Sequence, residues 1–183
     1  MTTECGKNKT TISHKLIKEW FLEINRFRMT HGVQPLVYED KLEKSALEIS
    51  QTMARLRNLE LNEPRTRHYG EIAGKLASTI NNITGKQLAA TWYATGDQYL
   101  YSLEEPVEET NAFTQLMWKS SKEVGFGHAF YNGSYMFVAH FYPPGNVEFE
   151  YGTNVYPSKQ PQNRTSQPSI GSIDNSIYVR LLS

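Results

Sequence analysis

The stretch Phe113–Ser121 reads FTQLMWKSS, and further along the chain Tyr142–Asn146 reads YPPGN. Between them, residues 124–131 and 134–142 have a strand-like pattern and flank Asn132-Gly133, the pair that two-residue type I′ turns prefer. The first stretch is predicted to end a helix that Asn111 caps, and the second to end a β-hairpin. This order of helix, hairpin and turn decides the fold.

The hairpin determines which side chains share a face of the sheet. In a two-residue hairpin the numbers of facing residues have a constant sum, so we expect His128 opposite Phe137. His140 then lies on the other face. The two histidines are therefore not expected to share a metal ion through this hairpin.

Upstream of the hairpin, apolar residues recur at helical spacing. We expect a first helix from a Ser13 cap to Gly32, a second that starts at Asp40, and a third from a Thr84 cap to about Asp97. The apolar stripes of the first two are Leu16, Trp20, Ile24 and Phe27, and then Leu42, Ala46, Ile49, Met53 and Leu56. Helices that enclose strands in this way favour the α/β class and a three-layer α/β/α sandwich.

Three further landmarks fall in a consistent order. Residues 25–32 carry the pattern N-x-x-R-x-x-H-G, residues 69–71 read YGE, and Tyr99 follows Trp92 by seven residues. Together with the two stretches above, they resemble the CAP superfamily of cysteine-rich secretory, venom allergen-like and plant pathogenesis-related proteins. The resemblance covers roughly residues 15–150 and implies the CAP fold, a three-layer sandwich around a central antiparallel sheet.

We expect a single domain. A chain of 183 residues with 39% hydrophobic residues can bury a substantial core. Residues 1–12 are expected to form a polar leader, residues 13–152 the CAP domain, and residues 153–183 a surface tail rich in Pro, Gln, Ser and Asn. The end of the tail, residues 177–182, is apolar enough to dock on the domain or to add an edge strand.

The resemblance also implies where a metal ion would bind, and the ligands are mostly missing. In the family, two histidines and two acidic residues hold a divalent ion, whereas the matching positions here include Ala112 for a histidine and Thr95 for a glutamate. Glu71 is retained. His68 lies three residues before it, and in an extended segment that spacing turns two side chains to opposite faces. We therefore expect no metal, no cofactor and no enzymatic activity, with Glu71, His68, Thr95 and Ala112 as the remnant of the cavity.

Cysteine content and charge indicate the compartment. The single cysteine, Cys5, can close no internal disulfide, and the first residues lack the apolar run of a signal peptide. The resemblance is therefore to the disulfide-free, intracellular branch of the family. We expect a cytoplasmic location, including a peripheral one on Golgi or other membranes, with leaderless secretion as the alternative.

Two function classes remain. One is lipid or sterol binding in an apolar groove, for which Tyr99, Tyr101 and Trp20 are the candidate residues. The other, which we favour, is a protein-interaction or scaffold module, for which the resemblance to the intracellular branch implies self-association as one mode. Its candidate surface is the acidic loop residues Glu104, Glu105, Glu108 and Glu109, facing the basic residues Arg55, Arg57, Arg65 and Arg67. Because 19 basic and 19 acidic residues balance, no nucleic-acid partner is expected, and no segment reads as transmembrane.

Overall fold

A computed structural model describes residues 5–58, 68–77, 83–102, 108–159 and 180–181 of the chain. Its elements are, in order, α1 (Cys5–Thr30), β1 (Val37–Tyr38), α2 (Asp40–Leu56), β2 (Gly70–Ala77), α3 (Gly85–Ala94), the 3₁₀ turns η1 (Thr95–Gln98) and η2 (Glu108–Thr110), α4 (Asn111–Met117), β3 (Glu123–Tyr131), β4 (Ser134–Tyr142), α5 (Tyr151–Asn154) and β5 (Arg180–Leu181).

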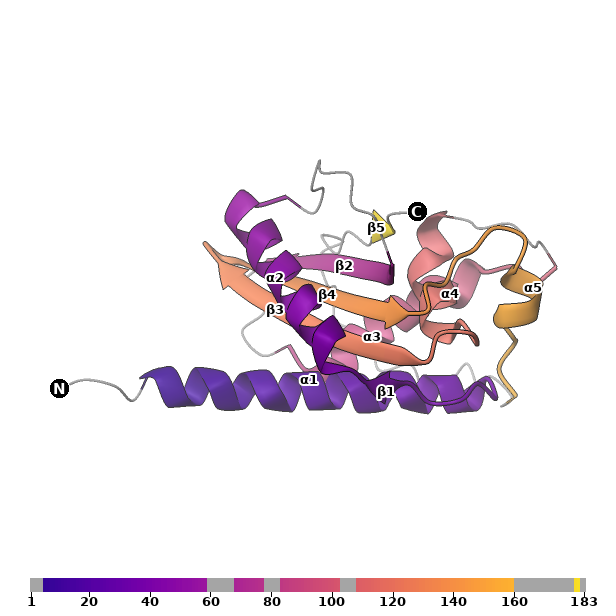
Figure 1. Cartoon of the computed structure of the whole chain (residues 1–183), viewed down its shortest axis with the longest axis horizontal. Coiled ribbons are helices and arrows are strands. Elements are labelled where there is room, and N and C mark those ends of the chain that lie inside the picture. The colour runs from indigo at the N-terminus through magenta and orange to yellow at the C-terminus, as the bar shows by residue number, and fades with distance from the viewer. Residues whose placement is uncertain (1–4, 59–67, 78–82, 103–107, 160–179, 182–183) are drawn as a thin grey trace.

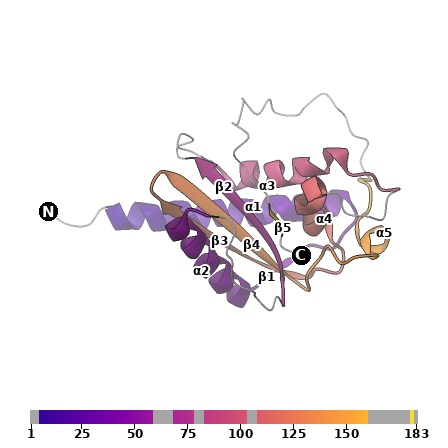
Figure 2. The ribbon, with the colours of Figure 1, turned by 90° about the horizontal axis from the view of Figure 1, so that it is seen from above.

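The elements form three layers around one sheet. The strand order is β1-β3-β4-β2-β5, and neighbouring strands are antiparallel except for β1 and β3, which are parallel. The helices α1, α3 and α4 cover one face of the sheet and α2 covers the other (Figures 1 and 2). The predicted α/β/α sandwich is confirmed.

The hairpin has the predicted turn and register. Asn132 and Gly133 both have positive φ, 45° and 82°, as a type I′ turn requires. His128 faces Phe137, and His140 faces Gly125 on the opposite face of the sheet. That face lies close to α2, because a Cβ atom at Gly127 would be 2.2 Å from the backbone nitrogen of Leu47.

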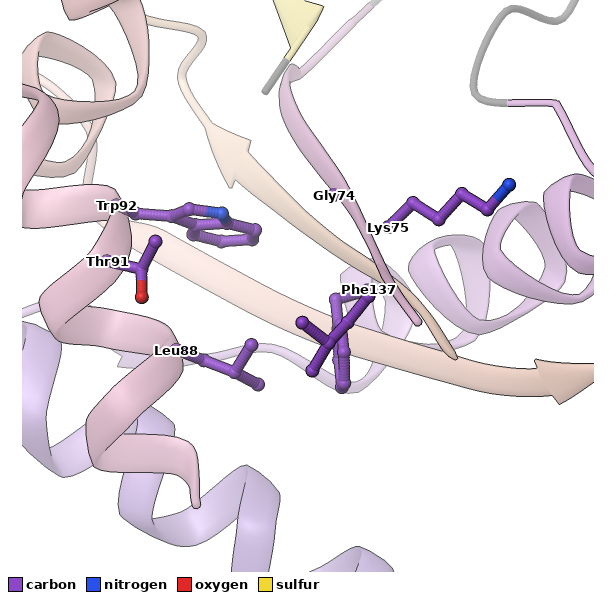
Figure 3. A pocket seen from close by; sticks show the side chains of 7 residues that line it. Gly74, Lys75, Leu88, Thr91, Trp92 and Phe137 are labelled. Atoms are coloured by element: carbon purple, nitrogen blue, oxygen red, sulfur yellow. The ribbon is translucent and has the colours of Figure 1, made fainter. Parts of the chain in front are cut away.

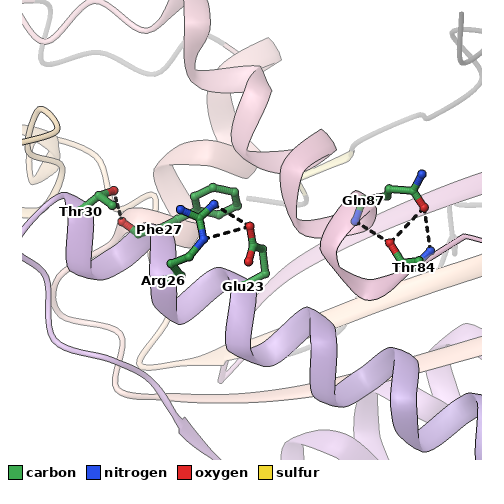
Figure 4. A network of polar contacts seen from close by, with 6 residues as sticks. All are labelled: Glu23, Arg26, Phe27, Thr30, Thr84 and Gln87. Atoms are coloured by element: carbon green, nitrogen blue, oxygen red, sulfur yellow. Dashed lines mark hydrogen bonds and ion pairs between the residues drawn. The ribbon is translucent and has the colours of Figure 1, made fainter. Parts of the chain in front are cut away.

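The predicted helix starts at Asp40 and after Thr84 are confirmed, and the start at Ser13 is not. Thr84 caps α3 in a full capping box, since its hydroxyl accepts from the Gln87 backbone N–H and the Gln87 side chain accepts from the Thr84 N–H (Figure 4). The prediction for Ser13 is wrong: α1 begins at Cys5 and runs through Ser13, as no proline or glycine between Gly6 and Ser13 interrupts it.

The caps of the other two helices come from the residue before each helix. Glu39 caps α2, which begins at Asp40 as predicted, because its carboxylate accepts from the backbone N–H of Lys41 at 3.1 Å. Thr110, rather than Asn111, precedes α4. On the solvent side of α1, Arg26 and Glu23 form a charged pair at 2.6 Å (Figure 4).

The core lies between the sheet and the α1, α3 and α4 layer. The whole predicted stripe of α1, Leu16, Trp20, Ile24 and Phe27, is buried. Trp20 has no exposed surface, and its ring lies 4.8 Å from Trp92 of α3 and 4.4 Å from Phe126 of β3. In the stripe of α2 Leu42, Ala46 and Met53 are buried, whereas Leu56 is exposed.

The chain after the hairpin packs further than predicted. Tyr151 and Val155 belong to the core, and the Asn154 side chain accepts from the Ser120 backbone N–H at 3.0 Å. Residues 153–159 are therefore part of the packed structure, not of a surface tail. The predicted edge strand at the C-terminal end is present as β5, which pairs with β2.

Arg28 joins α1 to the stretch that decides the fold. Its side chain is buried, and Nε donates to the Gln34 carbonyl at 2.9 Å. The two terminal nitrogens donate to the carbonyls of Leu116, Trp118 and Ser121 at 2.7–3.0 Å. Burial lowers the pKa of Arg28 to about 10, so the guanidinium stays charged at neutral pH. It complements the negative end of α4 and satisfies carbonyls that the helix leaves unbonded.

We predict that Arg28→Lys destabilises the protein by about 3 kcal/mol, because an ammonium group cannot reach four carbonyls in a planar fork. The matched control is Arg26→Lys, two residues away and exposed, which should change the free energy of unfolding by less than about 0.5 kcal/mol. Urea unfolding of the three proteins measures both values. Equal effects of the two substitutions would contradict this role of Arg28.

Candidate functional site

Two of the four expected cavity positions lie together at the start of α4. The Thr95 hydroxyl donates to the Trp92 carbonyl at 2.8 Å and accepts from the Phe113 backbone N–H at 3.1 Å. Ala112 has no exposed surface and belongs to the apolar core beside Phe113. The position of the acidic ligand thus holds a neutral hydroxyl that ties η1 to α4, and the position of the histidine holds a methyl group in the core.

Glu71 lies on the other face of the sheet. It faces His140 across the β2–β4 ladder, and its Oε2 lies 2.9 Å from Nε2 of His140. The side chains of the pair are 2% and 0% exposed. Ala73 and Val138, the next facing pair along these strands, pack against α2. The sheet therefore separates Glu71 from Thr95 and Ala112.

An aromatic ring and a hydroxyl complete this cluster. Tyr69 stacks on His140 with ring centroids 4.0 Å apart, and the Ser45 hydroxyl of α2 donates to the Tyr69 hydroxyl at 3.1 Å. A carboxylate and an imidazole in contact can exchange a proton. Both groups are buried, however, so the pair is placed to link β2 to β4 and not to meet a substrate.

His68 lies away from the Glu71–His140 pair. Its side chain is exposed, ahead of the first residue of β2. Within the part of the chain that the structure describes, no three His, Cys, Asp or Glu side chains gather in a group that could hold a metal ion. Asp97 is exposed in η1, as expected for a solvated helix end.

The candidate lipid residues mostly belong to the core. Trp20 is completely buried, and Tyr99 is buried with its ring 5.7 Å from Phe113. Tyr101 is 41% exposed and meets Tyr99 edge to face at 4.9 Å. Partial burial raises the pKa of Tyr101 to about 12. Of these three candidates, only Tyr101 presents a substantial aromatic surface to the solvent.

The structure describes some of the charged residues that are candidates for the partner surface. Glu109 is exposed, and Glu108 begins η2. Arg55 and Arg57 are exposed at the C-terminal end of α2. Glu104, Glu105, Arg65 and Arg67 lie outside the described residues.

A small hollow lies between β2 and α3 (Figure 3). It is lined by Gly74, Lys75, Leu76, Leu88, Thr91, Trp92 and Phe137. The volume open to the centre of a water molecule is about 10 Å³, which is space for about one water. Pockets for small organic ligands span roughly 300–1,000 Å³, so this hollow does not hold a sterol.

Hydrogen bonds join the stretch Phe113–Ser121 to the stretch Tyr142–Asn146. The Gln115 amide donates to the Ser121 hydroxyl at 3.2 Å and accepts from the Gly145 backbone N–H at 2.9 Å. The Thr114 hydroxyl donates to the Asn146 side chain at 2.6 Å. Both motifs therefore stabilise the fold.

His31, just after α1, contacts two residues that are distant in the sequence. Its ring bonds the Tyr156 carbonyl through Nδ1 and the Tyr93 hydroxyl through Nε2. Burial lowers the pKa of His31 below its ordinary value of 6.5. This neutral imidazole fastens residues 155–159 to α1 and α3, together with the Lys159 N–H, which donates to the Thr30 carbonyl at 2.8 Å.

Comparison with known proteins identifies relatives of the whole frame. Residues 21–141 match the family model described as CAP, the cysteine-rich secretory protein family. The human Golgi-associated plant pathogenesis-related protein 1 is 33% identical over 139 residues, which is 74% of this chain and 89% of that protein.

Solved structures share the fold at lower identity. NaASP2 with Zn²⁺ superposes with a TM-score of 0.56 at 14% identity, over 80% of this chain and 87% of that one. MpPR-1i superposes with a TM-score of 0.55 at 18% identity, over 82% and 96% of the two chains.

We predict that restoring two ligands does not restore a metal site. In the double variant Thr95→Glu/Ala112→His, the new side chains lie on the α4 side of the sheet, whereas Glu71 stays with His140 on the α2 side. Isothermal titration with zinc should show no stoichiometric site at micromolar concentration for either the wild type or the variant. A stoichiometric site in the variant would contradict the separation of these residues by the sheet.

We predict a pH dependence of stability that comes from His31. Because its folded pKa is lowered, the unfolded chain binds the proton more readily, and the stability due to neutral His31 is lost as the pH falls below 6.5 toward the folded value. His31→Gln should lower stability at pH 7.5 and flatten its fall between pH 7.5 and 5. The free energy of unfolding is measured against pH for both proteins, and the difference between the two curves isolates His31. A constant difference across this range would show that the histidine titrates alike in the folded and unfolded states.

Proposed function

Because the chain belongs to the CAP family, we propose that it is a non-enzymatic protein-interaction or scaffold module with a degenerate metal cavity. Members of this family are generally not enzymes. The observation that carries the proposal is how the residues at the expected cavity positions are used in the structure. Thr95 and Ala112 are used in packing and backbone bonding, and Glu71 pairs with His140 on the far face.

The surface available for a partner is charged. Glu108 and Glu109 lie in η2 just before α4, and Arg55 and Arg57 lie at the end of α2. The sequence just before η2 also contains Glu104 and Glu105. An acidic surface steers and orients a basic partner, and this attraction weakens as salt rises. We propose that the four glutamates form this docking surface.

Lipid or sterol binding is the second candidate function, and the exposed ring of Tyr101 beside Tyr99 is the feature that favours it. Against it, Trp20 and Tyr99 are committed to the core, and the hollow between β2 and α3 has space for about one water. The interaction module therefore remains the better account.

The location we propose is intracellular and cytoplasmic, including a peripheral place on Golgi or other membranes, with leaderless secretion as the alternative. It is supported by the human relative, whose name describes it as Golgi-associated, and by the single cysteine of this chain. Within the described ranges, no helix has the length and apolar character needed to cross a bilayer.

We predict that reversing Glu104, Glu105, Glu108 and Glu109 to lysine weakens binding of a captured protein partner at least tenfold. The partner is first isolated by affinity capture on the wild-type chain and then titrated in purified form at 0.15 M and 0.5 M salt. Raised salt should weaken wild-type binding in the same direction. The matched control reverses Glu19 and Glu23 of α1, which are outside the proposed acidic surface, and should bind as the wild type does.

Two outcomes would count against the proposal. One is unchanged partner affinity after the fourfold reversal. The other is saturable, salt-insensitive binding of a labelled sterol that is lost in Tyr101→Ala, which would move the assignment to the lipid class. Native mass spectrometry of the purified chain reports bound lipid, metal and partner in the same spectrum.

A further inference from the structure

The outer edge of β2 carries a strand from the far end of the chain. β5 pairs with β2 in antiparallel fashion through two facing pairs, Ile72 with Leu181 and Ala73 with Arg180. β2 continues for four more residues, Gly74–Ala77, and no other described strand pairs with its outer edge. In Figures 1 and 2, β5 lies beside one end of β2 only.

The direction of the backbone groups follows from the register. The Glu39 N–H donates to the Val124 carbonyl, so even-numbered residues of β3 point their backbone groups away from β4. Because hydrogen-bonded pairs alternate in an antiparallel ladder, Gly74 and Leu76 bond to β4. The N–H and C=O groups of Ala73 and Lys75 therefore face the outer edge, where an added strand would bond.

The hollow between β2 and α3 lies beside this edge. Gly74 and Leu76 contribute one side, Leu88, Thr91 and Trp92 of α3 the other (Figure 3). Gly74 has no side chain, which leaves the hollow open at the level of the strand. A hollow of this size fits part of one aliphatic side chain of a neighbouring strand, not a free ligand.

The sequence before β5 fits that hollow. Ile177, Val179 and Leu181 are apolar and alternate along the sequence, as one face of an added strand requires. Counted on from the Ile72–Leu181 pair, a longer strand would match Val179 to Gly74 and Ile177 to Leu76. Residues 177–179 lie outside the described residues, so this alignment rests on the sequence and on the register of β5.

We propose that the edge of β2 and the adjoining side of α3 form a peptide-binding site of the strand-addition type, occupied by the C-terminal segment of the same chain. Main-chain bonds to Ala73 and Lys75 supply affinity, and the hollow beside Gly74 selects an aliphatic side chain. An extended partner segment with aliphatic residues at alternate positions binds there only by displacing β5. The site is separate from the acidic surface proposed above, and either proposal can fail without the other.

Hydrogen exchange on the full chain tests whether the segment occupies the site. Arg180→Pro removes the backbone N–H of the residue that faces Ala73, so the amides of Ala73 and Lys75 should exchange at least tenfold faster than in the wild type. The amides of Gly74 and Leu76, which bond to β4, should not change. Thr165→Pro, in the same C-terminal region but outside β5, is the matched control. Unchanged exchange at both Ala73 and Lys75 would overturn the proposal.

Peptide binding tests whether the site accepts a strand. A fluorescent peptide with the sequence of residues 175–183 should bind full-length Arg180→Pro saturably, and bind the wild type at least tenfold more weakly because its own segment competes. Adding Thr91→Glu at the hollow should weaken peptide binding at least tenfold. Adding Lys86→Glu on the same helix should not, although it changes the charge more.

Three results would overturn the proposal. They are no peptide binding to Arg180→Pro, equal affinity for the wild type and Arg180→Pro, and equal effects of Thr91→Glu and Lys86→Glu. A wild-type dimer that Arg180→Pro converts to a monomer would also overturn it, because the segment would then occupy a second copy.

Discussion

Four backbone carbonyl groups converge on the guanidinium of Arg28, and the rest of the structure depends on this arrangement. One carbonyl belongs to Gln34, in the turn after α1, and the others to Leu116, Trp118 and Ser121, between the end of α4 and the start of β3. A buried cation is tolerated only when its donors are satisfied. The position of Arg28 therefore sets where α1, α4 and the hairpin meet.

Direct hydrogen bonds between protein groups also hold the segments around α4 together. Gln115, Ser121 and Gly145 join the helix-ending stretch to the turn after β4, and Thr95 fastens η1 to the first turn of α4. None of these bonds needs a bound ion. Thr95 and Ala112 contribute to packing and backbone bonding, and Glu71 pairs with His140. This arrangement supports the proposal that the fold serves as an interaction surface.

Local patterns in the sequence predicted much of the fold. The Asn132-Gly133 turn sets the register of β3 and β4 by short-range geometry, and the stripe from Leu16 to Phe27 faces the core because helical spacing requires it. The capping box at Thr84 is likewise a local signal. The absence of ligands at Ala112 and Thr95 could also be read from the motifs.

Contacts between distant residues could not be predicted in this way. The Glu71–His140 pair depends on how β2 aligns with β4, and no turn of defined length joins those two strands. The partners of His31 come from α3 and from residue 156, so no nearby residue signals them. The burial of Val155 was missed because the composition around it is that of a surface segment. The one available signal was that His140 falls on the α2 face of the hairpin, where a buried imidazole requires a polar partner.

The claim that Glu71 has become a structural partner is tested most directly by a double-mutant cycle of Glu71→Gln and His140→Asn. The free energies of unfolding of the wild type, the two single variants and the double variant give the coupling between the side chains. The account predicts a coupling of at least about 1.5 kcal/mol, as expected for buried groups in contact. Additive effects, within about 0.3 kcal/mol, would show that Glu71 and His140 do not depend on each other and would contradict the account.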